Sequence, residues 1–469
     1  MALGRRKRQR QSELWVPTAE LPRAAGHPFY EKRNRLLAEA RFDEFVEELC
    51  QPYYAERLGR PGIPPGVYFR MLLVGYFEGL DSQRGIAWRC ADSNSLKTFL
   101  GYSLTEATPE HSSLTRVRQR LPESVHEQVF AFVLSLAQSK KLLKGKTVGV
   151  DATLLEANAA MKSIVRRDTG DDYKQYLRRL AEEEGINDAG DDELRKFDQR
   201  RKKRVSNKDW RSPSDPDARI MKLKDGRTHL AYKAEHAVDL DSGLLLAATI
   251  HAGDRSDGDS LVDTLIAAQV NLIWAGSSAE LREVALDKGY HANAALAQCE
   301  AWGIRTYAAE KNEAYRRRWT DKPAAYKRSF CNNRRRVRGR RGKKLQKLRS
   351  EYCERSFAHV CETGGARRSW LRGLVAVGKR YLIQAAGYNL GVLMRQLFGV
   401  GTPRSLQGRS AAFGAAFLRA LGGLQCAFGG FWRLLCGRLA RLAILPITPP
   451  PGTAAGVITA ALPPRLAAA

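Results

Sequence analysis

Thr147–Asp151 has the sequence TVGVD, and Glu283–Tyr290 has the sequence EVALDKGY. Each segment holds a short apolar run that ends in an aspartate, Asp151 or Asp287, which is typical of a buried strand. Because alternate side chains of a strand share a face, the small residue two positions before each aspartate lies on its face and leaves room for a substrate. If the two strands are parallel neighbours, both carboxylates emerge at the carboxyl edge of one sheet, where open α/β sheets place their ligands.

The chain around these segments alternates between strand and helix patterns. We expect strands at 146–151, 228–239, 244–251, 284–287 and 304–308, and helices at 259–274, 292–302 and 345–361. The resulting order, βββαβαβα, predicts an α/β domain over residues 146–400, with a mixed sheet and helices on both faces.

The region before this domain, residues 28–140, is expected to be all-helical and to bind DNA. Apolar residues recur at helical spacing in Val67–Phe77 and Val125–Leu136. Between these stretches, a short predicted helix carries three arginines, Arg116, Arg118 and Arg120. Such a helix could read DNA in the manner of a helix-turn-helix. A plain helical bundle with a solvated basic face is the alternative.

Three other segments have an unusual composition. Residues 1–27 are basic and predict a flexible arm. Residues 162–227 are dense in both charge signs and poor in apolar residues, so we expect a charged insertion that is surface-exposed or partly disordered. Residues 401–469 are rich in Ala, Gly, Leu, Arg and Pro and form a low-complexity tail to which the sequence assigns no role.

The 469 residues carry 78 Lys and Arg against 50 Asp and Glu, a net charge of +28. A field of this sign attracts polyanions, so nucleic acid is the expected partner and anionic membrane is the rival. No apolar stretch approaches the roughly 20 residues of a spanning helix, and no apolar core follows the basic N-terminus as it would in a secretory signal. The eight cysteines show no zinc-finger spacing. We therefore expect a cytoplasmic protein with reduced thiols and no membrane partner.

Residues 311–349 are the most basic part of the chain, with 17 Lys and Arg but only 2 Asp and Glu. Aromatic residues are interleaved with the basic ones, namely Tyr315, Trp319, Tyr326 and Phe330. This combination favours phosphate contact and base stacking on DNA. A disordered basic linker is the alternative, and it would still bind DNA electrostatically.

A third carboxylate, Glu354, lies on the helix predicted at 345–361. If that helix packs on the sheet, Asp151, Asp287 and Glu354 can converge on one site. Oxygen ligands alone select hard cations such as Mg²⁺ or Mn²⁺, and two such ions about 3.5–4 Å apart can serve phosphoryl transfer. The alternative for an aspartate at a strand end is a turn or a helix cap, which we prefer for three other acids, Asp254, Asp257 and Asp259.

Several segments together carry a family resemblance: Gly149–Asn158 (GVDATLLEAN), Asp215–Lys222, Ala231–Asp239, Asp287–His291 (DKGYH), Gly303–Glu310, Glu354–Gly373 and Asn389-Leu390. By these segments, the chain resembles the DDE transposases of bacterial insertion sequences over about residues 60–400. The resemblance implies a ribonuclease-H-like core in which Asp151, Asp287 and Glu354 are the catalytic and metal-binding carboxylates. It also implies Mg²⁺ (or Mn²⁺), DNA of the element ends and of the target as partner, no small-molecule substrate, and a homodimer in the DNA complex.

The chain departs from the signature Tyr-x2-Arg-x3-Glu-x6-Lys that some relatives carry around the glutamate. Ser350 stands where that signature has arginine, and Cys361 stands where it has lysine. Glu351 and Glu362 are therefore rivals of Glu354 for the third position. A basic partner for the DNA end must then come from the arginines that follow the glutamate.

The side chains expected to contact DNA fall into four groups along the chain. They are Arg116, Arg118 and Arg120 in the helical region; Lys288, Tyr290 and His291 after the second aspartate; Arg316, Arg317, Arg334, Arg335 and Arg336 in the basic stretch; and Arg355, Arg367, Arg368 and Arg372 after the glutamate. For the second group, capping and packing of the next helix is the alternative.

The sequence thus predicts a DNA transposase of an insertion sequence, which cuts at terminal inverted repeats in the presence of Mg²⁺ and transfers the cut strands to target DNA. The bacterial host implied by the resemblance would keep it cytoplasmic and on the nucleoid when bound to DNA. Two alternatives remain within DNA chemistry: a nuclease of the same fold without strand transfer, and an inactive copy that binds DNA as a repressor. An RNA-binding protein is a third.

Overall fold

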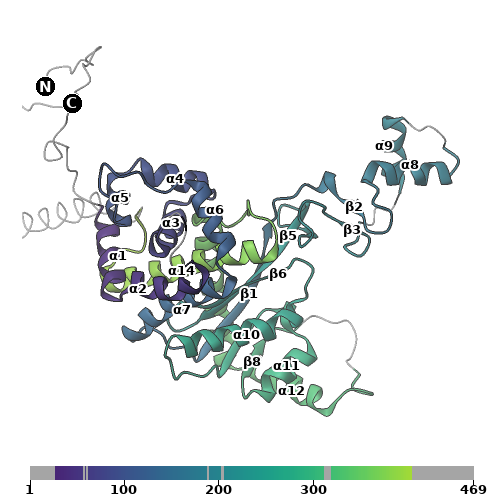
Figure 1. Cartoon of the computed structure of the whole chain (residues 1–469). Coiled ribbons are helices and arrows are strands. Elements are labelled where there is room, and N and C mark those ends of the chain that lie inside the picture. The colour runs from purple at the N-terminus through teal and green to yellow at the C-terminus, as the bar shows by residue number, and fades with distance from the viewer. Residues whose placement is uncertain are drawn as a thin grey trace, which may run out of the picture. The chain divides into compact units, whose positions relative to one another are not determined.

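The computed structural model describes residues 27–403, apart from 56–58, 60–61, 187–189, 202–204 and 311–317 (Figure 1). The predicted N-terminal arm up to residue 26 and the tail beyond residue 403 lie outside the described residues. The division into an arm, a helical domain, a catalytic domain and a tail therefore stays a prediction. Among the described residues, no helix is both long enough and apolar enough to span a membrane.

The first part of the described chain is helical, as predicted. Its helices are α1 (Pro28–Glu39), α2 (Phe42–Cys50), the 3₁₀ turn η1 (Gln51–Tyr53), α3 (Pro65–Glu78), α4 (Gln83–Ala91), α5 (Asn94–Leu100), α6 (His111–Arg120) and α7 (Glu123–Ser139). The two apolar stretches seen in the sequence are α3 and α7. Their aromatic residues Phe69 and Phe130 are fully buried, which explains why these helices are the most apolar of the region.

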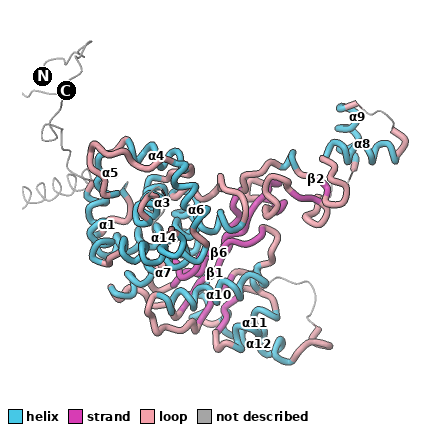
Figure 2. The backbone as a smooth tube through the Cα atoms, in the orientation of Figure 1, coloured by secondary structure: helices cyan, strands magenta, loops and turns pink. Residues whose placement is uncertain are grey.

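A six-stranded mixed sheet follows. It contains β1 (Thr147–Glu156), β4 (Arg219–Lys222), β5 (Thr228–Asp239), β6 (Leu245–Ala252), β7 (Glu283–Leu286) and β8 (Arg305–Ala308). The central strand β1 pairs antiparallel with β5 and parallel with β7, and β7 pairs parallel with β8. Strands β4 and β6 divide the other edge of β5 between them. Figure 2 shows these strands gathered between helices.

Helices cover both faces of this sheet. They are α10 (Asp257–Trp274), α11 (Asn293–Ala301), α12 (Ala324–Arg338), α13 (Arg340–Phe357), the π-helical turn η4 (Ala358–Thr363) and α14 (Leu374–Phe398). Ser260 of α10 hydrogen-bonds Glu235, whereas Ser356 of α13 hydrogen-bonds the next residue of the same strand, His236. Because successive side chains of a strand point to opposite faces, α10 and α13 lie on opposite faces. The predicted class, a mixed sheet between helices after a helical region, is confirmed.

The charged insertion is partly folded, so the expectation of disorder is wrong for its described part. It contains the 3₁₀ turn η2 (Met161–Ser163), the strand pair β2 (Val165–Arg166) and β3 (Trp210–Arg211), and a hairpin of α8 (Tyr173–Glu183) and α9 (Asp191–Arg200). Figure 1 shows this hairpin beyond the β2–β3 pair. A small apolar core holds it together, made of Leu177, Ala181, Leu194 and Phe197. The end of the predicted insertion also joins the main sheet as β4, through its pairing with β5.

Helix α14 connects the sheet to the helical region. Its Asn389 both accepts a hydrogen bond from the backbone N of Leu245 in β6 at 2.8 Å and donates one to the carbonyl oxygen of that residue at 2.9 Å. On another side of α14, Lys379 donates to the carbonyl oxygen of Arg118 in α6 at 3.2 Å. This buried helix therefore packs against both the sheet and the helical region.

Candidate active site

Asp151 and Asp287 lie at the same level of the sheet. In the parallel pair of β1 and β7, Gly149 faces Ala285 and Val150 faces Leu286. The predicted strand end at Asp151 is wrong, because β1 continues to Glu156 along its pairing with β5, whereas Asp287 directly follows β7 as predicted. Since β1 and β7 run in the same direction, the two aspartates lie at one level, where β7 ends, on the face that α13 covers.

A guanidinium group joins the two carboxylates. Arg349 of α13 donates from Nη1 to Asp151 Oδ2 at 2.6 Å, and its Nη2 lies 3.7 Å from Asp287 Oδ1. The arginine is buried because its stem lies over Gly149, where an added Cβ would be 3.1 Å from Arg349 Cγ. The small residue before Asp151 therefore makes room for this arginine, and not for a substrate as the sequence suggested.

The two aspartates differ in their surroundings. The side chain of Asp151 is 28% exposed and that of Asp287 is 45% exposed. Burial raises the pKa of the Asp151 carboxyl above its usual range; Arg349 and the backbone N–H of Ala152 oppose this rise, and the nearby negative charge of Asp287 adds to it. Two carboxylates this close disfavour each other's ionised form, and the positive charge of Arg349 between them favours it.

The structure does not bring Glu354 into contact with the two aspartates. Glu354 is exposed on α13, and its carboxylate accepts a hydrogen bond from Ser350 Oγ at 2.9 Å. Five residues separate it from Arg349, which corresponds to about 140° around a helix of 3.6 residues per turn. It lies eight residues beyond Gln346, whose side chain donates to the carbonyl oxygen of Leu286 at 3.0 Å, which corresponds to about 80° around the helix.

The two rivals for the third position are engaged by arginines. Glu351 accepts a hydrogen bond from Arg355 one turn later on α13. Glu362 lies on η4 and pairs with Arg367 at 2.6 Å. Arg367 also donates to Thr153 Oγ1 at 3.1 Å and so ties this pair to β1.

The residues after Asp287 divide into one exposed and two buried side chains. Lys288 is exposed. Tyr290 is only 1% exposed and His291 only 3% exposed, and the His291 ring lies edge-on to Phe330. The predicted DNA contact of Tyr290 and His291 is therefore wrong, and packing of this turn is the correct interpretation.

The three arginines of the helical region also differ. Arg116 is exposed on α6. Arg118 is half-buried, burial lowers its pKa, and its Nη1 has no hydrogen-bond partner in the described structure. Arg120 is exposed and lies over the ring of Tyr54, with its Cζ 4.7 Å from the ring centroid. The structure thus points Arg118 inwards and leaves Arg116 and Arg120 at the surface.

The basic stretch folds as α12 and the first half of α13, so the linker alternative is wrong for its described part. Phe330 is buried and cannot stack on a base. Arg336 is also turned inwards and donates to the carbonyl oxygen of Thr306 at 3.0 Å. Arg334 is paired with Glu310 at 2.7 Å, while Arg335 is exposed. Two predicted DNA-binding residues, Arg316 and Arg317, lie outside the described residues.

Two of the arginines that follow Glu354 contact the C-terminal part of β1 or the residues after it. Arg367 is bound to β1 as described above. Arg368 is exposed, with its Cζ 4.8 Å from the Trp370 ring centroid. Arg372 is exposed and donates to the carbonyl oxygen of Asn158 at 3.2 Å. Arg355 is exposed, although it is paired with Glu351.

Arg349 is the site residue that the sequence prediction missed. A signal for it exists, because Leu345, Cys353 and Ser356 are buried on α13 at spacings of three or four that include position 349. A basic residue within such a buried stripe needs an acidic partner from another element.

The donor set at the carboxyl edge suits a divalent metal ion in part. Asp151 and Asp287 supply only oxygen ligands, and the Arg349 guanidinium already stands between them as a cation. No group of three or more His, Cys, Asp or Glu side chains among the described residues is arranged to hold a metal ion. Of the three predicted ligands, Asp151 and Asp287 therefore lie together around Arg349, and Glu354 is not among the groups that contact them.

Two family models match the chain. The one described as Transposase domain (DUF772) matches residues 22–120, and the one described as Transposase DDE domain matches residues 208–390. Asp287 and Glu354 lie within the second match, whereas Asp151 precedes it on a strand that pairs with β5 and β7 inside it. No curated protein and no solved structure matches the chain.

The matches cover the helical region and most of the sheet, together more than half of the chain. A transposase DDE domain implies a ribonuclease-H-like fold, which agrees with the mixed sheet and its helices. It also indicates an enzyme that processes DNA, and such domains generally use divalent metal ions. The chain therefore belongs to the DDE transposases of insertion-sequence type.

Proposed function

We propose that this transposase cuts DNA at the terminal inverted repeats of its element and joins the cut strands to target DNA, with Asp151, Asp287 and Glu354 as the catalytic carboxylates. The observation that supports this most is the position of the two aspartates on neighbouring parallel strands, with one guanidinium between them. Carboxylates placed so close on a partly buried edge are suited to a cation, and DNA phosphates bring further negative charge to the same place.

Mg²⁺ or Mn²⁺ would be held by Asp151 and Asp287, with Glu354 as the third ligand. When bound, the cation stabilises negative charge at the scissile phosphate and lowers the pKa of water. For this to happen, Arg349 has to give up at least part of its interaction with the aspartates. Glu354 has to leave Ser350 and approach the two aspartates from a position about 140° around α13 from Arg349.

The chemistry proposed is two phosphoryl transfers at the same site. In the first, water attacks the phosphorus at the element end, and a DNA 3′ hydroxyl leaves. In the second, that 3′ hydroxyl attacks the phosphorus of target DNA, and the target strand provides the leaving oxygen. Neither step uses a protein nucleophile, so no serine or tyrosine is assigned a covalent role.

DNA would be held by exposed arginine and lysine side chains near this edge and in the helical region. On α12 and α13, Arg335, Lys343, Lys344 and Lys347 are exposed, and Arg116 and Arg120 are exposed on α6. We further propose that two copies of the chain act together in the DNA complex, one at each element end.

Asp287→Asn tests the site with little change in shape. We expect this variant to lose Mg²⁺-dependent cleavage of element-end DNA by about 10³-fold, because loss of a ligand removes several kcal/mol of charge stabilisation. Asp241→Asn, an exposed change at the β5–β6 turn, is the matched control and should cleave as the wild type does. Cleavage that survives Asp287→Asn would refute the proposal.

A second assay separates the alternatives. The wild type should join DNA with pre-cleaved 3′ ends to a target plasmid. Because this substrate needs no cleavage by the protein, the assay measures strand transfer alone. A chain that cleaves but never joins is a nuclease, and a chain that binds the ends without Mg²⁺-dependent cleavage is a repressor.

A further inference from the structure

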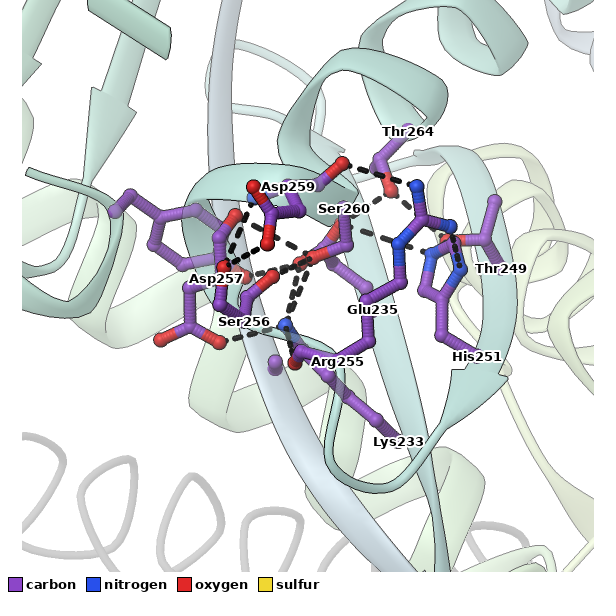
Figure 3. Close-up of polar contacts among 12 residues, drawn as sticks. Lys233, Glu235, Thr249, His251, Arg255, Ser256, Asp257, Asp259, Ser260 and Thr264 are labelled. Carbon is purple, nitrogen blue, oxygen red and sulfur yellow. Dashed lines mark hydrogen bonds and ion pairs between the residues drawn. The ribbon is translucent and has the colours of Figure 1, made fainter. Parts of the chain in front are cut away.

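A second cluster of charged groups is buried on the opposite face of the sheet, behind Asp287. Lys233 and Glu235 of β5 are 3% and 0% exposed, and α10 covers them (Figure 3). Groups this deeply buried cannot touch DNA. Charged side chains are rarely kept at such positions unless they are paired and hydrogen-bonded, so the partners of these two residues matter.

Glu235 accepts hydrogen bonds from α10 and from the turn after Asp287. From α10, Ser260 Oγ donates to its Oε1 at 2.9 Å, and Thr264 Oγ1 donates to its Oε2. From the turn, Tyr290 donates its hydroxyl to Glu235 Oε1 at 2.6 Å. Lys233 Nζ lies 3.5 Å from the same oxygen. Both oxygens of this carboxylate are thus occupied, by groups from three different elements.

The same cluster reaches the turn after Asp287 at a second point. Lys233 pairs with Asp257 Oδ1 at 2.6 Å, as Figure 3 shows. The other oxygen of Asp257 would lie 2.0 Å from a Cβ added at Gly289, so the carboxylate is in contact with the backbone of the turn. A side chain at this position would require Asp257, which pairs with Lys233, to shift.

Asp287 itself depends on this turn for its position. Strand β7 ends at Leu286, and the 3₁₀ turn Lys288–Tyr290 begins directly after the aspartate. The turn is closed by the backbone N–H of Tyr290, which donates to the carbonyl oxygen of Asp287 at 3.2 Å. The only ion pair of the Asp287 carboxylate within the described residues is the long one to Arg349, at 3.7 Å. Contacts on the far side of the turn must therefore fix the backbone from which this carboxylate projects.

We propose that Glu235 is a positioning residue, which acts with Lys233 and through Tyr290 to set the place of the Asp287 carboxylate relative to Asp151. The inference rests on the proposed function, because only there is Asp287 a metal-binding carboxylate. Tyr290, the tyrosine of the segment DKGY, is buried and therefore cannot contact DNA, and this proposal gives it a different role. A ligand held by such outer partners binds its metal more weakly when they are removed.

Tyr290→Phe removes the hydroxyl and keeps the ring. Its matched control is Tyr232→Phe, because Tyr232 of β5 is equally buried and donates to the Asp215 carboxylate at the same distance, 2.6 Å, outside the cluster. Two quantities are compared in the purified full chain without DNA: Mn²⁺ affinity by calorimetry, and hydrogen exchange of the backbone amides from Tyr290 to Ala292. Melting temperature is recorded for both variants, since Tyr290→Phe loses the hydrogen bond to Glu235, and Tyr232→Phe loses the one to Asp215 and one accepted from the backbone N of Gly373 at 3.1 Å.

Tyr290→Phe should weaken Mn²⁺ binding about tenfold and speed amide exchange in the turn, whereas Tyr232→Phe should leave both at the wild-type level even where the melting temperatures fall equally. Thr264→Val removes a donor to Glu235 without touching the turn and should weaken Mn²⁺ binding in the same direction. Glu235→Gln keeps an acceptor for Tyr290 and should retain more affinity than Glu235→Leu.

Wild-type Mn²⁺ affinity in Tyr290→Phe, or equal losses in Tyr290→Phe and Tyr232→Phe, would overturn the positioning role. The proposed function fails separately. If Asp287→Asn binds Mn²⁺ as tightly as the wild type, Asp287 is no ligand at all. If Asp287→Asn loses binding and Tyr290→Phe does not, the site stands and only the role of Glu235 is refuted.

Discussion

At the scale of single residues, one arginine side chain lies between the two aspartates and offsets part of their negative charge. Arg349 touches Asp151 at 2.6 Å and lies 3.7 Å from Asp287, so its positive charge stands where a metal ion would be bound by the same oxygens. Without it, two neighbouring carboxylates would repel each other on a partly buried edge. The arginine thus offsets this repulsion in the metal-free chain, and at the proposed site it would compete with the metal.

Arg349→Gln should separate these two effects. We expect the variant to bind Mn²⁺ more tightly without DNA, by about tenfold if the arginine stabilises the metal-free state by roughly 1.4 kcal/mol. Without metal, the same variant should unfold more easily, because Asp151 loses its counter-charge. Arg340→Gln, an exposed change on the same helix, is the control for net charge. Unchanged Mn²⁺ affinity in Arg349→Gln would show that the arginine does not compete.

At the scale of helices and strands, the regular amphipathic elements were predictable and the others were not. The strand predicted at 228–239 is β5 without change, and the helix predicted at 259–274 differs from α10 only at its start. Strand β4 was missed because its four residues carry too little pattern within a charged stretch. Helix α14 was missed because it is buried on nearly all sides, which erases the amphipathic period.

The candidate site follows the same division. The level of the two aspartates could be predicted, because strand periodicity and a parallel pairing determine it. The roles of Arg349 and Tyr290 could not, since both depend on contacts between elements far apart in the sequence. The sequence around Glu354 also does not show that its carboxylate accepts a hydrogen bond from Ser350 and does not face the sheet.

The joint between α3, η4 and α14 is the element-scale feature most open to test. Gly364 at the end of η4 and Gly387 in α14 lie against the two edges of the Tyr76 ring, and a Cβ at Gly364 would be 2.6 Å from Tyr76 Cδ2. Gly364→Ala should therefore lower the free energy of unfolding in urea by about 1–3 kcal/mol through overpacking. Gly62→Ala, where the added Cβ would meet Tyr54 Cε1 at an ordinary 3.5 Å, should change it little. Equal stabilities of the two variants would contradict this packing.

At the scale of the whole molecule, charge is distributed unevenly. Residues 311–349 alone carry 17 Lys and Arg against 2 Asp and Glu, a large share of the net +28. The structure folds the described part of this stretch onto the sheet as α12 and α13, and α13 also carries Arg349 and Glu354. The exposed lysines of α13 thus share one helix with Glu354 and with Arg349, which contacts Asp151. A phosphate held by these lysines therefore lies near the proposed reaction site.

Replacing Lys343, Lys344 and Lys347 by glutamine tests whether this helix binds DNA. We expect weaker binding to every DNA sequence, because phosphate contacts carry no sequence information. The slope of log K against log salt concentration should fall by about 0.9 for each phosphate that the variant no longer neutralises. The control replaces Lys140, Lys144 and Lys146, which are exposed before the start of β1 and lie outside α13. This second triple variant removes the same charge, so an equal loss of affinity and of slope in both would mean that net charge, and not α13, attracts the DNA.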